Sequence, residues 1–451
     1  MTKSYGCTFL AAAQRRSASA PDKLGLQAMI CVVVLFCTAA VIAAPAQSVF
    51  FTTLVSFNGS NGNLPSAPVI QATDGNLYGT TRWGGDNCGS DGCGIVFKIT
   101  PGGNLSTLYS FCLLPNCADG RAPWAPVVQA ADGNFYGTTD GGGTYSLGTV
   151  FKITAAGTLT TLYSFCALGY PCPDGYGPDT GLIQGVDGNF YGITGDGGSS
   201  NYCVGPNCGT VFKITPQGAL TTLYSFCSQS GCPDGAYPIA ALVQSSDGTL
   251  YGTTYFGGAN SGCINDENGC GTVFKITLDG TLTTLYSFCS QSGCTDGAYP
   301  YAGLVQGTDG NFYGTTAGGG TMDCDPFPCG TVFKITPAGV LTTLYVFHGT
   351  DGAVPYGGLV QATDGDFYGT TFSGGTHSGG TVFKITPAGT LTTLHNFCAK
   401  LWPCADGNGP EAGLVQATNG FFYGTTTAGG GDDYGTVFRI GLPRSCATCR
   451  P

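Results

Sequence analysis

Two histidines and a nearby aspartate are unrepeated residues of this chain whose types could carry acid–base or metal chemistry. His348 and His377 are two of only three histidines, and Asp351 lies close to the first of them. An imidazole titrates near neutral pH, so it can transfer protons or ligate a metal ion. The three residues are therefore candidate catalytic residues. Ordinary loop positions are the interpretation we favour, because no serine-hydrolase elbow, P-loop or zinc-protease motif is present.

The carboxylates give little support to an active site. Only two of the 27 acidic residues are glutamates, Glu267 and Glu411. Asp-Gly recurs twice in most of the repeats described below, which is typical of turns. A glycosidase needs two carboxylates in unlike environments, and repeated aspartates offer no such pair. Asp266-Glu267 and Asp323/Asp325 could bind calcium but lack the ligand spacing of an EF-hand loop. We therefore predict no metal site and no cofactor.

Three tryptophans are the candidate binding residues. Trp83, Trp124 and Trp402 all lie in connections between predicted strands. A flat indole face suits stacking against a sugar ring. The tryptophans therefore favour a glycan as the ligand.

Twenty of the 23 cysteines fall into ten pairs that are close in sequence. In an exported protein this predicts disulfide bonds, each closing a loop of about six residues and contributing about 2 kcal/mol. Tetrahedral zinc is the alternative, but it needs four ligands and no histidine accompanies the pairs. The last pair could be redox-active, although it lacks a thioredoxin-like context. The predicted pairs are Cys88–Cys93, Cys112–Cys117, Cys166–Cys172, Cys203–Cys208, Cys227–Cys232, Cys263–Cys270, Cys289–Cys294, Cys324–Cys329, Cys398–Cys404 and Cys446–Cys449.

The first 46 residues have the pattern of a secretory signal. Four basic residues precede an apolar run over 28–44, and Ala44-Pro45-Ala46 offers a small-residue cleavage site. A retained membrane anchor is the alternative, since the run is at the lower limit for spanning. No other run could span a membrane. We therefore expect a mature chain that is secreted or at the cell surface, with no membrane span.

Composition excludes several classes of protein. The 451 residues include 76 glycines and 25 prolines, yet 42% are hydrophobic and 12% aromatic. A disordered chain could not reach that apolar content, and glycine follows no three-residue period, which excludes collagen. Acidic residues outnumber basic ones by 27 to 16, which argues against nucleic acid as a partner.

These features sit on a sevenfold internal repeat. Each copy holds four short runs rich in Val, Ile, Phe, Tyr and Thr, for example 303–306, 311–316, 330–336 and 341–347. Such runs, bounded by Gly, Pro or Asp, predict β-strands, and Asp-Gly between the first two predicts a tight hairpin. The repeats are centred on Tyr78, Tyr136, Tyr191, Tyr251, Tyr313, Tyr368 and Tyr423.

Seven copies of four antiparallel strands predict an all-β, seven-bladed β-propeller over residues 47–441, followed by a tail at 442–451. The last repeat lacks a fourth run, and a matching run stands alone at 50–57, before the first repeat. If 50–57 completes the last blade, the ring closes and no strand edge is left unpaired.

The repeat resembles the GloVer-type tandem repeat of secreted bacterial "choice-of-anchor" proteins. The resemblance rests on Gly-Leu-Val-Gln, Asp-Gly-Asn-Phe-Tyr-Gly-Thr-Thr and Gly-Thr-Val-Phe-Lys-Ile-Thr-Pro-Ala-Gly-Thr-Leu-Thr-Thr-Leu-Tyr-Ser-Phe, and it covers about residues 50–441. It implies an exported repeat protein with no established catalytic residues. The chain departs from the family in lacking an apolar sorting tail, so secretion is favoured over anchoring.

Two further residues recur in every blade. A lysine or arginine recurs in the third run, and we expect it to lie along the next blade and pair with a repeated aspartate; a functional cationic ring is the alternative. A glutamine recurs on the innermost strand, either to satisfy backbone groups, which we favour, or to line the channel. The basic residues are Lys98, Lys152, Lys213, Lys275, Lys334, Lys384 and Arg439, and the glutamines are Gln71, Gln129, Gln184, Gln244, Gln306, Gln361 and Gln416.

Strand parity places nine of the cysteine pairs on one face of the ring, because successive connections of an antiparallel meander alternate between faces. Loops held by a rigid scaffold commonly bind ligands. We therefore predict a secreted, monomeric, non-enzymatic scaffold that binds a glycan or an extracellular protein through this face. The alternatives are an extracellular polysaccharide hydrolase or lyase, and a structural surface protein with no ligand.

Overall fold

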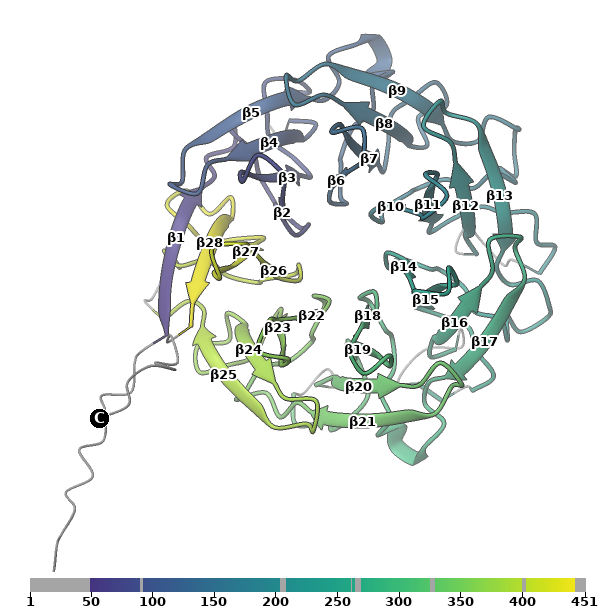
Figure 1. Cartoon of the computed structure of the whole chain (residues 1–451), viewed down its shortest axis with the longest axis vertical. Coiled ribbons are helices and arrows are strands. Elements are labelled where there is room, and N and C mark those ends of the chain that lie inside the picture. The colour runs from purple at the N-terminus through teal and green to yellow at the C-terminus, as the bar shows by residue number, and fades with distance from the viewer. Residues whose placement is uncertain are drawn as a thin grey trace, which may run out of the picture. The chain divides into compact units, whose positions relative to one another are not determined.

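The computed structural model describes residues 49–442, apart from 90–91, 203–207, 261, 264–268, 325–328 and 400–402. These residues form seven four-stranded antiparallel sheets, arranged as the blades of a ring (Figure 1). The prediction of an all-β, seven-bladed propeller is confirmed. The predicted signal at 1–46 and nearly all of the predicted tail lie outside the described residues. Within the described part of the chain, no helix has the length and apolar character that crossing a membrane requires.

Each blade runs from a two-residue innermost strand to a longer outer strand. Blade 1 contains β2 (Ile70–Gln71), β3 (Leu77–Thr81), β4 (Ile95–Ile99) and β5 (Leu105–Ser110); blade 2 contains β6 (Val128–Gln129), β7 (Phe135–Thr139), β8 (Thr149–Ile153) and β9 (Leu159–Ser164). Blade 3 contains β10 (Ile183–Gln184), β11 (Phe190–Thr194), β12 (Thr210–Ile214) and β13 (Leu220–Ser225); blade 4 contains β14 (Val243–Gln244), β15 (Leu250–Thr254), β16 (Thr272–Ile276) and β17 (Leu282–Ser287).

Blade 5 contains β18 (Val305–Gln306), β19 (Phe312–Thr316), β20 (Thr331–Ile335) and β21 (Leu341–Val346); blade 6 contains β22 (Val360–Gln361), β23 (Phe367–Thr371), β24 (Thr381–Ile385) and β25 (Leu391–Asn396). Blade 7 contains β26 (Val415–Gln416), β27 (Phe422–Thr426), β28 (Thr436–Gly441) and β1 (Phe50–Ser56). Two short 3-10 helices, η1 (Pro115–Cys117) and η2 (Ser292–Cys294), lie in connections between blades.

The two ends of the described chain meet in blade 7, as predicted. Strand β1 pairs antiparallel with β28, with Phe50 opposite Gly441 and Ser56 opposite Thr436 (Figure 1). The first described strand therefore supplies the outer strand of the last blade. This pairing removes the open edge that β28 would otherwise expose.

The core lies between neighbouring blades and explains the repeated Phe-Tyr-Gly-Thr-Thr phrase. Every residue of β19 is buried. The ring of Tyr313 stacks on Phe367 of the next blade, with centroids 4.0 Å apart. Glycine follows this tyrosine because a Cβ on Gly314 would lie 2.6 Å from the Phe333 ring of β20. The aromatic pair and the adjacent glycine thus hold two strands and two blades together.

The repeated lysine pairs with a repeated aspartate, but inside its own blade. Lys334 Nζ lies 2.9 Å from Asp309 Oδ2, an atom that also accepts a 2.9 Å hydrogen bond from the Tyr313 hydroxyl. All three residues belong to blade 5. The same ion pair recurs in blades 1, 2, 3 and 6. The hairpin turn is therefore tied to the third strand of the same blade, and not to the next blade.

The repeated glutamine ties adjacent blades through backbone groups. Gln361 Oε1 accepts a 2.8 Å hydrogen bond from the Thr308 N–H in blade 5, and its Nε2 donates to the Gly365 carbonyl in its own blade. The Thr418 N–H donates to Gln71 Oε1 at 2.8 Å, which makes the same link between blades 7 and 1. Satisfaction of backbone groups is thus the role that the structure gives to these glutamines.

Candidate functional site

The sevenfold repeat varies at the residue that follows a repeated proline just before each innermost strand. In blade 5, Pro300 precedes Tyr301, and the small residues Ala302 and Gly303 lead toward β18. Proline fixes the local backbone, and small residues let blades approach closely: a Cβ on Gly303 would lie 2.6 Å from the Ala241 carbonyl oxygen. Seven variable residues, here called the variable ring, line one cavity of about 550 Å³: Ser66, Trp124, Asp179, Ile239, Tyr301, Tyr356 and Glu411.

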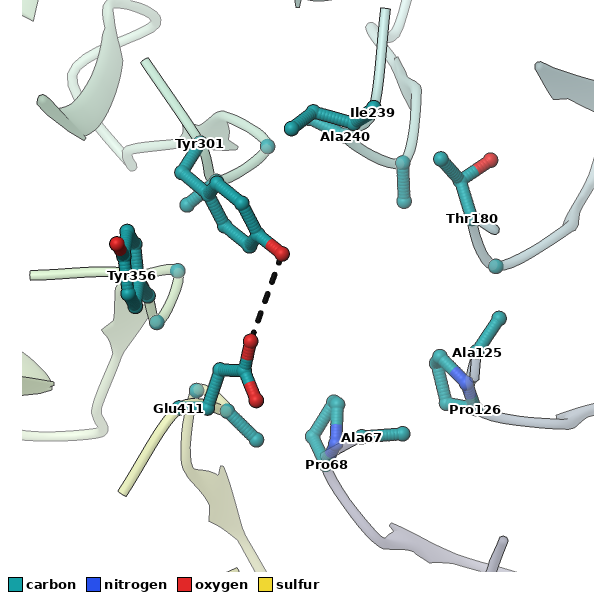
Figure 2. A pocket seen from close by; sticks show the side chains of 18 of the residues that line it. Ala67, Pro68, Ala125, Pro126, Thr180, Ile239, Ala240, Tyr301, Tyr356 and Glu411 are labelled. Carbon is teal, nitrogen blue, oxygen red and sulfur yellow. Dashed lines mark hydrogen bonds between the residues drawn. The ribbon is translucent and has the colours of Figure 1, made fainter. Parts of the chain in front are cut away.

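The cavity lies at the centre of the ring of blades, where the innermost strands begin. Most of its lining residues belong to connections that carry cysteines; Trp124, for example, lies between β5 and β6, in the same connection as Cys112 and Cys117. The connections that lead to β2 and β22 line the cavity on the same face but carry no cysteine. Figure 2 shows Tyr301 and Glu411 projecting toward each other, with small side chains around them. The variable ring therefore lies on the face of the propeller that the sequence predicts to carry the cysteine pairs.

The residue before each of these prolines has a left-handed backbone, with φ between 53° and 63°. This conformation strains residues other than glycine. In blade 5 it is fixed by two backbone hydrogen bonds of 2.9 Å: the Tyr299 N–H donates to the Cys270 carbonyl, and the Ala317 N–H donates to the Tyr299 carbonyl. The variable ring thus follows a rigidly held segment. The seven left-handed residues are Leu64, Ala122, Gly177, Tyr237, Tyr299, Val354 and Gly409.

Four tyrosines from blades 4, 5 and 6 form one side of the cavity, here called the tyrosine wall: Tyr237, Tyr255, Tyr301 and Tyr356. The rings of Tyr301 and Tyr356 lie 4.4 Å apart between centroids. Tyr255 contacts Tyr301 edge-on at 6.1 Å and Tyr237 edge-on at 6.3 Å. The wall combines flat apolar faces with hydroxyl groups, which is the lining expected of a small-ligand site.

Glu411 brings a carboxyl group to the cavity. The Tyr301 hydroxyl donates a 3.4 Å hydrogen bond to Glu411 Oε1 (Figure 2). Burial raises the pKa of Glu411, while the Tyr301 hydroxyl and the charge of Arg82 act in the opposite direction. Burial and the Glu411 charge in turn raise the pKa of Tyr301. Glu411 can therefore hold a proton at a higher pH than an exposed glutamate.

A second carboxyl group of the cavity, Asp179, has two further aspartates beside it. Asp140 and Asp196 belong to the connections after β7 and β11, and a Cβ on Gly177 would lie 3.8 Å from Asp140 Oδ1 and 3.4 Å from Asp196 Oδ2. Burial and the neighbouring Asp140 raise the pKa of Asp179 well above its usual value, and the same causes raise that of Asp196 to about 6. We call Asp140, Asp179 and Asp196 the acidic cluster.

One cation faces this cluster. The Arg82 guanidinium stacks on the Trp124 ring at 3.6 Å and lies 5.0 Å from the Trp83 ring. Its charge lowers the pKa of Asp179, but less than burial and Asp140 raise it. Of the predicted tryptophans, Trp124 lines the cavity, Trp83 contacts Arg82 without lining it, and Trp402 lies outside the described residues.

The structure does not place the predicted catalytic residues in the cavity. His348 is exposed, with Nδ1 2.9 Å from Asp323 Oδ2. His377 Nδ1 lies 2.9 Å from the Thr376 hydroxyl. Asp351 accepts a 2.5 Å hydrogen bond from the Tyr345 hydroxyl. The same tyrosine–aspartate bond recurs in blades 1 to 4, and His395 with Asp406 replaces it in blade 6 at 3.1 Å. Asp351 therefore takes part in a repeated structural contact.

Eight of the ten predicted cysteine pairs are bonded in the structure. Cys203 and the pair Cys446–Cys449 lie outside the described residues, as do Asp266, Glu267 and Asp325. The bonded pairs are Cys88–Cys93, Cys112–Cys117, Cys166–Cys172, Cys227–Cys232, Cys263–Cys270, Cys289–Cys294, Cys324–Cys329 and Cys398–Cys404.

Two of these disulfides lie close together beside blade 1. The four Sγ atoms of Cys88, Cys93, Cys112 and Cys117 lie within 4.8 Å of one another. Four ligands for a tetrahedral metal are thus close together at this point, contrary to the expectation from sequence. Here the four sulfurs are joined as two disulfides.

Sequence reasoning missed Asp179, Glu411 and the tyrosine wall. Attention to what repeats passed over this position, which does not repeat. The signal that could have found these residues is the proline before each innermost strand, since the residue after it is different in nearly every copy.

Comparisons with known proteins bear mainly on the fold and the family. No curated protein matches the chain. Similar solved structures include the periplasmic gluconolactonase of Pseudomonas aeruginosa, with 16% identity, a TM-score of 0.45, and coverage of 76% of this chain and 86% of that one. A PQQ-bound aldose sugar dehydrogenase from Streptomyces coelicolor has 11% identity and a TM-score of 0.41, with coverage of 88% of this chain and 100% of that one. A luciferin-regenerating enzyme has 10% identity and a TM-score of 0.41, with coverage of 87% of this chain and 95% of that one. Likeness at this level says nothing about activity.

The repeat itself identifies the family. The model of the Gloeobacter/Verrucomicrobia repeat matches residues 40–265 and 263–448. These two matches span most of the chain, including all seven blades, and the chain therefore belongs to the Gloeobacter/Verrucomicrobia repeat family.

Proposed function

We propose that the protein is an exported binding protein whose central cavity takes a carbohydrate. The observation that carries the proposal is the variable ring. Closure of the propeller requires proline and small residues at this level of every blade, but it does not require Trp124, Asp179, Tyr301 and Glu411. All seven residues at this variable position line one cavity, which favours a ligand at that place.

The lining suits a sugar. The faces of Tyr301, Tyr356 and Trp124 can stack on the C–H faces of a sugar ring. Asp179, Glu411 and the tyrosine hydroxyls can bond its hydroxyl groups. The disulfides hold the loops around the cavity, so less conformational entropy is lost when the ligand binds. They also indicate an extracytoplasmic protein, which agrees with cleavage of a signal near residue 46.

Binding to a glycan array, followed by titration calorimetry with the best ligand, tests the proposal. Trp124→Ala and Tyr301→Ala each remove one stacking face and should weaken binding at least about tenfold. Tyr145→Ala is the matched control, because Tyr145 is 49% exposed and does not line the cavity. Unchanged affinity in the two cavity variants would refute the site, and absence of any glycan ligand would favour a structural surface protein.

A polysaccharide hydrolase or lyase is a second candidate, supported by the two cavity carboxyls. Asp179 and Glu411 have raised pKa values in different surroundings, and general acid–base catalysis uses carboxyls of that kind. Release of reducing or unsaturated ends from a polysaccharide panel tests this function. Activity lost in Asp179→Asn and Glu411→Gln but kept in His348→Ala would support it, and absence of release by the unaltered protein would exclude it for that panel.

A further inference from the structure

The charges around the cavity are predominantly negative. Asp179 and Glu411 line it, and Asp140 and Asp196 stand beside Asp179. Among the described residues, Arg82 is the one cation whose charge acts on both lining carboxyls, and it is stacked on Trp124. The hydroxyl groups of a neutral sugar can hydrogen-bond these carboxyl groups, but they would not neutralise their charge. A ligand with a positive charge would complement it.

The described carboxyls do not form a three-ligand metal site. Across the described ranges, no three acidic side chains bring ligand oxygens within 4.8 Å of one another; the cysteines of blade 1 are the group that meets this distance. An ammonium group needs only one or two carboxylate partners, which it hydrogen-bonds at about 2.8 Å. Because no third acidic side chain converges among the described residues, the site favours an organic cation over calcium or zinc.

Asp179 has an unsatisfied atom. Its Oδ1 is buried and, among the described residues, has no hydrogen-bond partner; the same holds for Oδ1 of Asp196. A buried carboxylate oxygen without a donor is costly. Arg82 does not supply that donor, although its charge acts on Asp179. A proton shared with Asp140 supplies a donor in the empty cavity, and a charged donor from a ligand would take its place.

The tyrosine wall fits the same kind of ligand. Aromatic faces attract ammonium groups as well as sugar rings, and Tyr237 lies close enough to the acidic cluster for its pKa to be raised to about 12 by burial and by the charges of Asp179, Asp196 and Asp140. Carboxyls and aromatic faces thus meet on one cavity lining.

We propose that the ligand is an amino sugar with a free amine, bound with its ammonium group at Asp179 and its ring against the tyrosine wall. This inference rests on the proposed carbohydrate function and narrows it to one class. Glucosamine oligomers, the free-amine form of a β-linked glucosamine polymer, are the probe. N-acetylglucosamine and glucose oligomers of equal length supply the same ring without the charge.

Binding should be coupled to proton release. The groups that act on Asp179 are Asp140, Asp196 and Arg82, and repulsion among the three carboxyls favours a shared proton in the empty cavity. A bound cation favours the ionised carboxyls instead, so protons leave as the ligand enters. Affinity for the free-amine oligomer should therefore rise with pH as the cluster loses its proton, a range that includes the Asp196 pKa of about 6, and the neutral oligomers should show no such rise.

Titration calorimetry with the three oligomers decides between the outcomes. We expect the free-amine oligomer to bind at least about tenfold more tightly than the other two, and Asp179→Asn to abolish that difference. Asp432→Asn is the matched control, because Asp432 is an exposed aspartate that does not line the cavity. Equal affinity for all three oligomers would refute the proposal that the ligand carries a free amine, but it would still support a carbohydrate site. A preference for the free-amine oligomer that persists in Asp179→Asn would refute the placement of the ammonium group at Asp179. Absence of binding by every oligomer and by every glycan of the array would overturn the carbohydrate function itself.

Discussion

The Tyr301 hydroxyl donates a 3.4 Å hydrogen bond to Glu411 Oε1 and so joins blades 5 and 7 at the central cavity (Figure 2). Tyr356, from the blade between them, packs against the Tyr301 ring at 4.4 Å. Three consecutive blades thus contribute to one arrangement of side chains, which no single repeat contains. The cavity is a property of the closed ring.

Removing this hydrogen bond should raise the pKa of Glu411 further. The Tyr301 hydroxyl stabilises the ionised carboxylate against the effect of burial, so Tyr301→Phe shifts its titration to higher pH. Glutamate occurs only twice, at Glu267 and Glu411, and carboxyl-labelled glutamate therefore gives two NMR signals that Glu411→Gln assigns. A Glu411 pKa that falls or stays constant in Tyr301→Phe would contradict the hydrogen bond.

The acidic cluster should make stability depend on pH in an unusual direction. The folded-state pKa of Asp196 is raised to about 6, so the folded state binds more protons than the unfolded state between about pH 4 and pH 6. The contribution of this group to stability is present at low pH and is lost as pH rises through that window. Asp196→Asn should therefore raise the free energy of unfolding near pH 8 and leave it unchanged near pH 4. Denaturant unfolding at both pH values measures this, and a loss of stability near pH 8 would show that Asp196 is not repelled by its neighbours.

The strand that closes the ring should be essential for stability. Phe57 follows β1, is fully buried and packs 5.4 Å from the Phe97 ring of blade 1. Phe57→Ala should cost about 3 to 5 kcal/mol of unfolding free energy, as for other buried phenylalanines. Phe50→Ala, at a 52% exposed residue of the same strand, is the control and should change stability little. Similar losses in the two variants, measured by chemical denaturation, would argue against the packing of β1 into the ring.

Each disulfide should contribute a modest and local stabilisation. Cys289–Cys294 closes a loop of five-residue sequence separation beside η2. The double variant Cys289→Ser/Cys294→Ser should lose about 2 kcal/mol and keep the propeller fold by circular dichroism. Mass spectrometry after alkylation without reduction should find neither cysteine of the unaltered protein labelled. Alkylation of both cysteines would show that this staple does not form.

The sequence and the structure agree where the argument depended on repetition. Tyr313 and its counterparts recur at intervals of 55 to 62 residues, which was sufficient to predict seven blades because the phrase around the tyrosine is local and occurs in seven copies. The unmatched strand at 50–57 was sufficient to predict ring closure. The sequence predicted that the repeated lysine pairs with a repeated aspartate, but not that the lysine stays within its own blade, where Lys334 pairs with Asp309. Which of two neighbouring turns an alkyl chain reaches depends on the twist of the sheet, and residue spacing does not record that twist.

The cavity was not predictable by the same means. Asp179 and Glu411 are distant in sequence, and each is an isolated departure from its repeat. Their proximity to one cavity follows from ring closure. Their raised pKa values follow from burial and, for Asp179, from the neighbouring Asp140, against the opposing charge of Arg82. His348 and His377 were chosen as candidate catalytic residues because histidine is rare in this chain. A rare residue type does not by itself show that side chains converge on one site.

The affinity of the secreted protein for its best array glycan, measured by titration calorimetry in the unaltered chain, Tyr301→Ala, Trp124→Ala and Tyr145→Ala, tests most directly whether the variable ring is a binding site. We predict that the two cavity variants bind at least about tenfold more weakly while the Tyr145 variant binds as the unaltered protein does. Full affinity in both cavity variants, with each shown to be folded, would contradict the assignment of the ligand to the central cavity.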